Sequence, residues 1–232
     1  TNFWQPVPKK EIETLKAILS LPEKDNRIIL LTIGGDGTSK GAQEVLQALK
    51  KMPSLNILYF IKIMPGEDGF FEGLKEKRLI KNSIVKKKVR YIMGRFSNEF
   101  IRALINLCDI YVAPSRHEGF GLPHIEAMAC QKPVITCQGS AAEETSLNKI
   151  TGYVVPSHPF KWRNAGGYTV NGVRAGIPEL KKVIKNLVEN RKPRETMGKK
   201  ARRHIVENYE SKKIAQLFLK KIRALPKARF LF

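Results

Sequence analysis

Two glutamates flank a glycine-rich turn near the middle of the sequence. Glu118 is followed by a Gly-Phe-Gly-Leu turn at residues 119–122, and Glu126 comes four residues after the turn. Glycine lets a backbone approach a ligand closely, and a helix that begins at Leu122 would direct unpaired N–H groups and a positive dipole end at an anion. Carboxylates beside such a site repel phosphate but accept hydrogen bonds from hydroxyl groups. The pattern therefore predicts a site for a ligand that carries phosphate and sugar or ribose hydroxyls, the alternative being two solvated acids around an ordinary turn.

The turn is expected between a strand and a helix in a chain where strands and helices alternate. This alternation predicts an α/β fold, a Rossmann-like parallel sheet of about six strands with helices on both faces. In such sheets ligands bind beyond the carboxyl ends of the strands, so functional residues should cluster there. From the apolar runs and capping residues, we expect strands at 27–33, 55–63, 89–93, 110–113, 133–137 and 152–155, and helices at 11–21, 40–51, 70–82, 97–108, 122–130 and 211–225, with two more helices before the last one.

A second glycine-rich loop follows the first predicted strand and ends in Lys40 and Gly41. Lys40 is a candidate phosphate-binding cation at a helix start, although most lysines at such positions only face water. The Gly35-x-Gly37 spacing also matches part of the dinucleotide-binding fingerprint. That fingerprint needs a third small residue where Lys40 stands and an acid where Lys62 ends the next strand, so a dehydrogenase is disfavoured.

The stretch 114–129 resembles the donor-site signature of the retaining glycosyltransferases of group 1, also called family 4, whose hallmark is two glutamates around a Gly-Phe-Gly turn. The loop that ends in Lys40 and Gly41 and the segments 89–96, 103–115, 132–135 and 152–156 are similar to this family as well. The resemblance covers residues 20–156 well. It implies one half of a GT-B architecture, the C-terminal domain that binds the nucleotide-sugar, with the acceptor-binding N-terminal domain missing from this chain.

The resemblance implies transfer of a hexose from a nucleoside-diphosphate sugar to a glycan or lipid acceptor, by a chain that is inactive without its acceptor domain. Glu118 beside the sugar and Lys40 beside the diphosphate would be catalytic, and Glu126 would accept hydrogen bonds from the ribose. No metal and no cofactor are expected, since basic side chains and a helix N-terminus meet the phosphate charge. The implied donor-binding residues are Gly35, Lys40, Glu118, Gly119, Phe120, Gly121, Leu122 and Glu126.

One feature departs from the family pattern. An arginine commonly stands a few residues before the lysine, but residues 34–37 read Gly-Gly-Asp-Gly. Either another basic residue supplies this charge or donor binding is weaker.

The chain is strongly basic. Forty-two lysines and arginines against 21 acids give a net charge of +21, which attracts polyanions such as nucleic acid or an anionic bilayer. Segments 75–90 and 181–203 hold much of this charge; they are interpreted as solvated helix faces, with an anionic membrane surface as the alternative partner. Nucleic acid is disfavoured because no aromatic-interleaved RNA-binding motif or zinc-finger spacing occurs. The alternative function is a non-catalytic basic domain of the same fold that binds an anionic surface or polyanion.

We expect three regions: an interdomain connector with a first helix at 1–26, the nucleotide-sugar-binding domain at 27–208, and a C-terminal helix and tail at 209–232 that packs toward the missing domain. Residues 157–176 are rich in Gly, Pro and Asn and predict a long surface loop or insertion. The chain opens without Met, so it is expected to be a piece of a longer protein.

The cysteines and the hydrophobic runs bear on the compartment. Three cysteines without a C-x-x-C pair predict buried free thiols in a reducing cytoplasm. The longest apolar run, 28–33, has the length of a strand, and no signal-peptide pattern is present. A cytoplasmic protein is expected, with peripheral attachment at the inner membrane face as the alternative.

Overall fold

The computed structural model describes residues 2–34, 39–64, 73–163 and 167–224. Its centre is a six-stranded parallel sheet in the order β3-β2-β1-β4-β5-β6, which confirms the expected fold class. The carboxyl ends of β1, β4 and β5 lie side by side and form the rim where the glycine-rich turn was expected. The strands are β1 (Ile28–Ile33), β2 (Ile57–Ile63), β3 (Val89–Met93), β4 (Ile110–Val112), β5 (Val134–Cys137) and β6 (Gly152–Val155).

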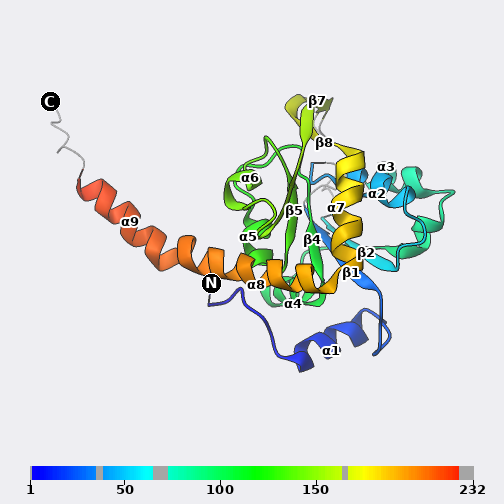
Figure 1. The fold of residues 1–232 in the computed structure, drawn as a ribbon, viewed down its shortest axis with the longest axis horizontal. Helices are drawn as coiled ribbons and strands as arrows, with labels where there is room; N and C mark the ends of the chain where they lie inside the picture. Colours follow the sequence, from blue (N-terminus) through cyan, green and yellow to red (C-terminus); the bar gives the residue numbers. More distant parts are fainter. Residues whose placement is uncertain (1, 35–38, 65–72, 164–166, 225–232) are drawn as a thin grey trace.

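Helices cover both faces of the sheet (Figure 1). The strands are continuous apolar runs because both of their faces are buried. On β1, Leu30 packs into the core under α2 and α7, whereas Leu31 packs into the core on the other face. The helices are α1 (Lys9–Ile18), α2 (Ala42–Lys50), α3 (Gly73–Ile80), α4 (Asn98–Leu107), α5 (Leu122–Ala129), α6 (Ala142–Thr145), α7 (Ile177–Glu189), α8 (Arg191–Asn208) and α9 (Ser211–Arg223), with a 3-10 turn η1 (Ile84–Lys88) before β3.

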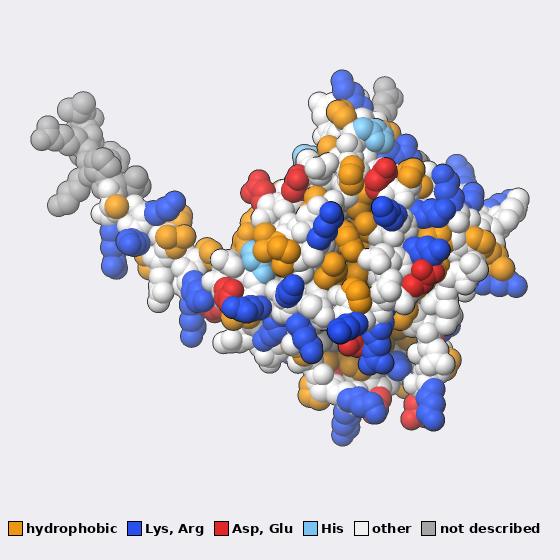
Figure 2. All heavy atoms as spheres, viewed as in Figure 1, with side chains coloured by type: hydrophobic (Ala, Val, Ile, Leu, Met, Phe, Trp, Pro, Cys, Tyr) orange, Lys and Arg blue, Asp and Glu red, His pale blue; other side chains and the backbone are white. Residues whose placement is uncertain are grey.

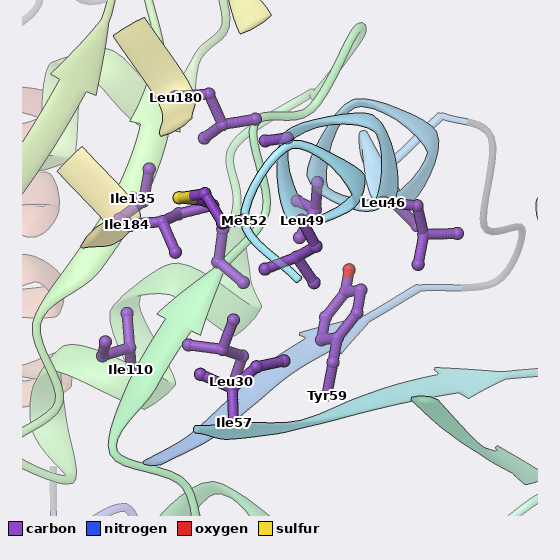
Figure 3. Packing of buried hydrophobic residues seen from close by; sticks show 14 of the residues in the cluster. Leu30, Leu46, Leu49, Met52, Ile57, Tyr59, Ile110, Ile135, Leu180 and Ile184 are labelled. Atoms are coloured by element: carbon purple, nitrogen blue, oxygen red, sulfur yellow. The ribbon is translucent and has the colours of Figure 1, made fainter. Parts of the chain in front are cut away.

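Figure 3 shows how the core between the sheet and helices α2 and α7 is filled. Leu46 and Leu49 of α2 and Leu180 of α7 meet the side chains of the sheet, including Leu30 and Tyr59. The Tyr59 hydroxyl is buried and lies 2.6 Å from the Thr32 hydroxyl oxygen, so its polar end is satisfied within the sheet. This packing fixes α2, and with it the loop that carries Lys40, against the strands.

The prediction of a surface loop at 157–176 was wrong. The segment forms a two-stranded antiparallel hairpin, β7 (Ser157–Arg163) and β8 (Thr169–Ala175). Its apolar residues alternate with polar ones, as Phe160 and Trp162 do on one strand, and this period of two was obscured by the Gly, Pro and Asn content. Gly172 is required by close packing, since a Cβ there would lie 2.1 Å from the Arg116 carbonyl oxygen and 2.8 Å from the Trp162 ring. The hairpin stands beyond the carboxyl end of the sheet (Figure 1).

The C-terminal helices follow the prediction in order and type. Helix α8 packs against α5, whereas α9 extends away from the sheet and none of its residues is buried within the part of the chain that the structure describes (Figure 1). The partner expected for residues 209–232 therefore stays a prediction. None of the helices in the described ranges is long and apolar enough to cross a bilayer.

Candidate functional site

The turn between Glu118 and Glu126 joins β4 to α5 at the rim of the sheet. Gly121 caps α5 with φ 86°, a left-handed conformation that favours glycine, and a Cβ there would lie 3.1 Å from the Ala142 Cβ. At Gly119 a Cβ would meet no atom within 4 Å. Phe120 and Leu122 are 49% and 59% exposed although both are apolar. The turn thus presents open backbone and apolar side chains beside the N-terminus of α5, which begins at Leu122 as the sequence predicted.

Lys40 and Glu118 form an ion pair across this rim. Lys40 Nζ donates to Glu118 Oε2 over 2.6 Å, and the side chains are 19% and 11% exposed. The two residues follow β1 and β4, which are neighbours in the sheet although 78 positions separate the residues. A Cβ at Gly41 would lie 2.3 Å from the Pro114 carbonyl oxygen, so this glycine allows the two loops to touch. The structure thus joins the two residues predicted to be catalytic.

Glu126 lies in the second turn of α5, and burial raises the pKa of its carboxyl group to about 7. Its side chain has no hydrogen-bond partner among the residues of the described ranges. Burial raises the pKa of Tyr111 well above its ordinary value, and the charges of Glu118 and Glu126 both add to this shift. Both carboxylates therefore lie close enough to this buried tyrosine of β4 to disfavour its ionised form.

His124 lies beneath the turn and is buried. Its Nε2 is 2.9 Å from the Ala113 carbonyl oxygen, and burial lowers its pKa to about 4, so the ring is neutral at pH 7. A neutral ring that donates from Nε2 leaves Nδ1 as an acceptor, and Nδ1 is buried without a hydrogen-bond partner in the described part of the chain. No role for this histidine was predicted from the sequence; its position three residues after the Gly121 cap is the signal for a role in holding the turn.

A buried charge cluster supports the same loop and was missed in the sequence. Arg116 Nη2 lies 2.7 Å and Arg174 Nε 2.9 Å from Glu44 Oε1, and Glu44 is fully buried. The two guanidinium groups lie over the Phe160 ring, at 5.0 Å and 4.9 Å from its centroid. Residues from α2, the Glu118 loop and the β7–β8 hairpin are thereby fixed together. Arg116 is paired with Glu44 and buried, so its charge is not presented at the surface of the rim.

Gly35 lies outside the residues that the structure describes. Among the residues that it does describe, no group of three or more His, Cys, Asp or Glu side chains is placed to hold a metal ion. Cys108, Cys130 and Cys137 are free thiols and all three are buried, as expected.

The fold and the rim define a Rossmann-like domain with a polar site at the carboxyl edge of its parallel sheet. The sequence profile described as Glycosyl transferases group 1 matches residues 12–164. Because this match spans more than half of the chain, the protein belongs to the group 1 glycosyltransferase family.

Two curated relatives show the extent of the similarity. An uncharacterised glycosyltransferase of Methanocaldococcus jannaschii is 28% identical over 170 residues, which are 72% of this chain and 40% of the relative. The alpha-galactosylglucosyldiacylglycerol synthase of Streptococcus pneumoniae is 26% identical over 132 residues, 57% of this chain and 34% of the relative. The chain thus spans less than half the length of both relatives.

Solved structures share the fold. The Anabaena protein HepE in complex with UDP and glucose superposes with a TM-score of 0.77 at 18% identity, over 97% of this chain and 55% of HepE. The C-terminal domain of a group 1 glycosyltransferase from Francisella tularensis gives a TM-score of 0.70 at 20% identity, over 90% of this chain and 97% of that domain. The protein has the fold of the C-terminal domain of these GT-B enzymes.

Proposed function

We propose that this domain binds the nucleoside-diphosphate sugar donor of a retaining hexosyltransferase. The observation that carries the proposal is the 2.6 Å pair of Lys40 and Glu118 beside the open Gly119 turn and the N-terminus of α5. A cation and oriented N–H groups suit a diphosphate, and a carboxylate suits sugar hydroxyls. The acceptor would be a glycan or lipid. Transfer would require an acceptor domain in addition to this chain, which alone is expected to be inactive.

The proposed chemistry assigns one task to each group. When donor binds, the diphosphate takes the place of Glu118 beside Lys40, and Glu118 turns to the hydroxyls of the sugar. During transfer the bond between the sugar C1 and the diphosphate oxygen breaks, and the electron pair remains on the diphosphate. Lys40 and the N-terminus of α5 stabilise that developing charge, while the acceptor oxygen forms the new bond to C1 and its proton passes to the departing diphosphate oxygen. No metal is invoked, because these groups supply the positive charge.

Glu126 is proposed to accept hydrogen bonds from the ribose. Its carboxyl group is partly buried, and protein groups in the described ranges leave it unpartnered, so it is available to a ligand. Uridine is the first base to test, since HepE binds UDP. A glycolipid is the first acceptor class to test, since the Streptococcus relative is named for a diacylglycerol glycolipid.

A thermal-shift panel tests the proposal. The panel contains uridine, guanosine and adenosine diphosphates and their sugar derivatives, each titrated to saturation. Donor at about 100 times its Kd stabilises the native state by about 2.7 kcal/mol, which corresponds to a rise in Tm of roughly 5–10 °C for a chain of this size. Glu126→Ala should weaken the selected ligand, and Lys50→Ala, an exposed lysine at the end of α2, should not. A panel without any saturable binding would instead favour the non-catalytic basic domain.

A further inference from the structure

A hollow with an apolar floor lies at the edge of the sheet that is formed by β3. Its volume is about 360 Å³, and Ile80, Val89 and Tyr91 contribute its apolar surface. Helix α3 and the 3-10 turn η1 form its walls. Because η1 precedes β3, the hollow lies toward the amino end of this strand. The proposed donor site around Lys40 and Glu118, here called the donor rim, lies instead at the carboxyl ends of the strands.

The walls of the hollow are basic. Lys77, Arg78, Lys81 and Lys86 line it. The whole segment 77–90 contains seven lysines and arginines and no acidic residue. We call the residues Lys77, Arg78, Lys81, Ile84, Lys86 and Lys87 the basic face. On the side of the molecule where Figure 1 labels α3, Figure 2 shows Lys and Arg side chains with hydrophobic side chains between them.

Three cations of this segment have partners inside the protein, and one of them is Lys77, whose Nζ lies over the Tyr91 ring at 5.4 Å from its centroid. Lys88 Nζ donates to the Pro53 carbonyl oxygen over 2.6 Å, and Arg90 Nη1 donates to the Leu19 carbonyl oxygen over 2.8 Å. These contacts hold the edge of the sheet together. In contrast, the exposed side chains of Arg78, Lys81, Lys86 and Lys87 form no ion pair with any residue in the described ranges.

The other basic region, α8, differs in this respect. There Arg191 pairs with Glu195 at 2.7 Å and Arg203 with Glu207 at 2.8 Å, one turn apart on an exposed helix surface. Such pairs offset part of the positive charge of that helix. Within the described part of the chain, Arg78, Lys81, Lys86 and Lys87 have no such acidic partner, so the basic face is better suited than α8 to attract an anionic partner.

An exposed apolar residue shares the 3-10 turn η1 with Lys86 and Lys87. Ile84, in η1, is 60% exposed and stands directly before the buried Val85 and the lysines of the same turn. Cations next to an exposed apolar side chain match the boundary of a bilayer, where lipid phosphates lie next to hydrocarbon. A nucleic acid backbone offers the negative charge but no hydrocarbon for Ile84.

We propose that the basic face docks on an anionic lipid bilayer, with its cations against lipid phosphates and Ile84 in the headgroup layer. The donor rim stays open in this arrangement because it lies at the other end of the strands. The proposal goes beyond donor binding and does not depend on it: a domain that failed to bind nucleotide-sugars could still dock in this way.

The test is co-sedimentation of the chain with vesicles. Vesicles that mix phosphatidylglycerol with phosphatidylcholine should bind the chain, and vesicles of phosphatidylcholine alone should not; added salt should weaken the binding. The double variant Lys81→Glu/Lys86→Glu should weaken partitioning by roughly 25-fold or more, since each basic residue near an anionic surface contributes a factor of about 5. Ile84→Ser should weaken binding without changing the charge.

A matched control separates this face from the total charge. Lys192→Glu/Lys200→Glu changes two exposed lysines of α8 and the same net charge. It should retain most of the binding. Equal losses in the two double variants would overturn the proposal, as would unchanged binding in Lys81→Glu/Lys86→Glu or absence of binding by the unaltered chain. Binding of a DNA duplex that only the face variant loses, without vesicle binding, would assign the face to nucleic acid instead. Thermal unfolding and nucleotide-sugar titration of each variant show whether the fold and the donor site are intact.

Discussion

The Arg116 guanidinium lies 2.7 Å from Glu44 Oε1, in a buried ion pair two residues before Glu118. Arg174 of the β7–β8 hairpin reaches the same oxygen from another direction. The backbone reinforces this arrangement, because the Arg116 N–H donates to the Ser39 carbonyl oxygen next to Lys40, and the Arg116 carbonyl accepts from Val173. The positions of Lys40 and Glu118 therefore depend on one carboxylate that faces neither ligand nor solvent.

Replacing this carboxylate should destabilise the protein. Glu44→Ala leaves the buried Arg116 guanidinium without its counter-charge, and removal of one partner from a buried pair costs about 3–5 kcal/mol. Urea unfolding measures this loss in the free energy of unfolding. Glu13→Ala, which removes a half-exposed partner of Lys9, should cost less than about 1 kcal/mol. Similar costs for the two variants would show that the Glu44 cluster does not support the loop.

The strands could be predicted from the sequence, whereas the Glu44 cluster could not. The strands were predictable because both faces of the sheet are buried and each strand is an uninterrupted apolar run, as at 28–33. The common rim of Lys40 and Glu118 followed from the parallel topology. The contacts of Glu44 did not, since they join residues 72 and 130 positions apart through side-chain packing. The hairpin was missed because its glycines and prolines are also typical of loops, and no periodicity argument reveals that Gly172 lets the Arg116 backbone approach the hairpin.

Substitutions of Lys40 and Glu118 should change the affinities for nucleotide-sugar and nucleoside diphosphate in different ways. Lys40→Ala removes a charge-assisted contact to phosphate and should cost about 1.5–3 kcal/mol of donor affinity, which is roughly a 10- to 150-fold rise in Kd. Glu118→Gln should weaken the nucleotide-sugar but not the nucleoside diphosphate, because it loses a sugar contact and also releases Lys40 from its partner. Calorimetric titration of each ligand measures both effects.

Lys50→Ala serves as the control for this pair, since it removes an equal charge from an exposed position. Unchanged nucleotide-sugar affinity in Lys40→Ala would exclude the role of Lys40 at the diphosphate. A parallel loss of both ligands in Glu118→Gln would show that Glu118 organises the loop and does not contact the sugar.

Substitutions of the two glycines of the turn should affect different properties: Gly121→Ala the stability of the fold, and Gly119→Ala the binding of the donor. Gly121→Ala introduces a Cβ at φ 86° and 3.1 Å from Ala142, so it should lower the free energy of unfolding by at least about 1 kcal/mol. Gly119→Ala meets no atom within 4 Å and should leave Tm unchanged. If the Gly119 backbone approaches the donor, the same methyl group should nevertheless weaken nucleotide-sugar binding. Thermal unfolding with and without ligand gives both quantities, and normal donor affinity in Gly119→Ala would place the ligand elsewhere.

Donor affinity should increase with pH around neutrality. The pKa of Glu126 is about 7, and the ionised carboxylate is the stronger acceptor for ribose hydroxyls. Because only the ionised fraction is fully competent, affinity should rise about tenfold between about pH 6 and pH 8. A nucleotide-sugar is the right probe, since it lacks the monoester phosphate that titrates near pH 6. Calorimetry over this range should give a flat profile for Glu126→Gln; an equal slope in both proteins would assign the titration to another group.

Glu126 and His124 should act in opposite directions on stability in one pH window. The pKa of Glu126 is raised in the folded state from 4.5 to about 7, so the unfolded chain ionises first and stability falls as pH rises between these values. The pKa of His124 is lowered from 6.5 to about 4, so the unfolded chain binds a proton first and stability falls as pH drops from 6.5 to 4. The two slopes offset each other in the unaltered protein.

Single variants should therefore expose one slope each. Glu126→Gln should be more stable than the unaltered protein at pH 8, by about 1–2 kcal/mol after allowance for its partial exposure, and should lose stability steeply below pH 6. His124→Gln, whose amide can still donate to the Ala113 carbonyl, should lose stability as pH rises from 4.5 to 7. Urea unfolding at a series of pH values measures both slopes. Parallel curves for the two variants would mean that neither residue is titrating in the buried environment that the structure gives it.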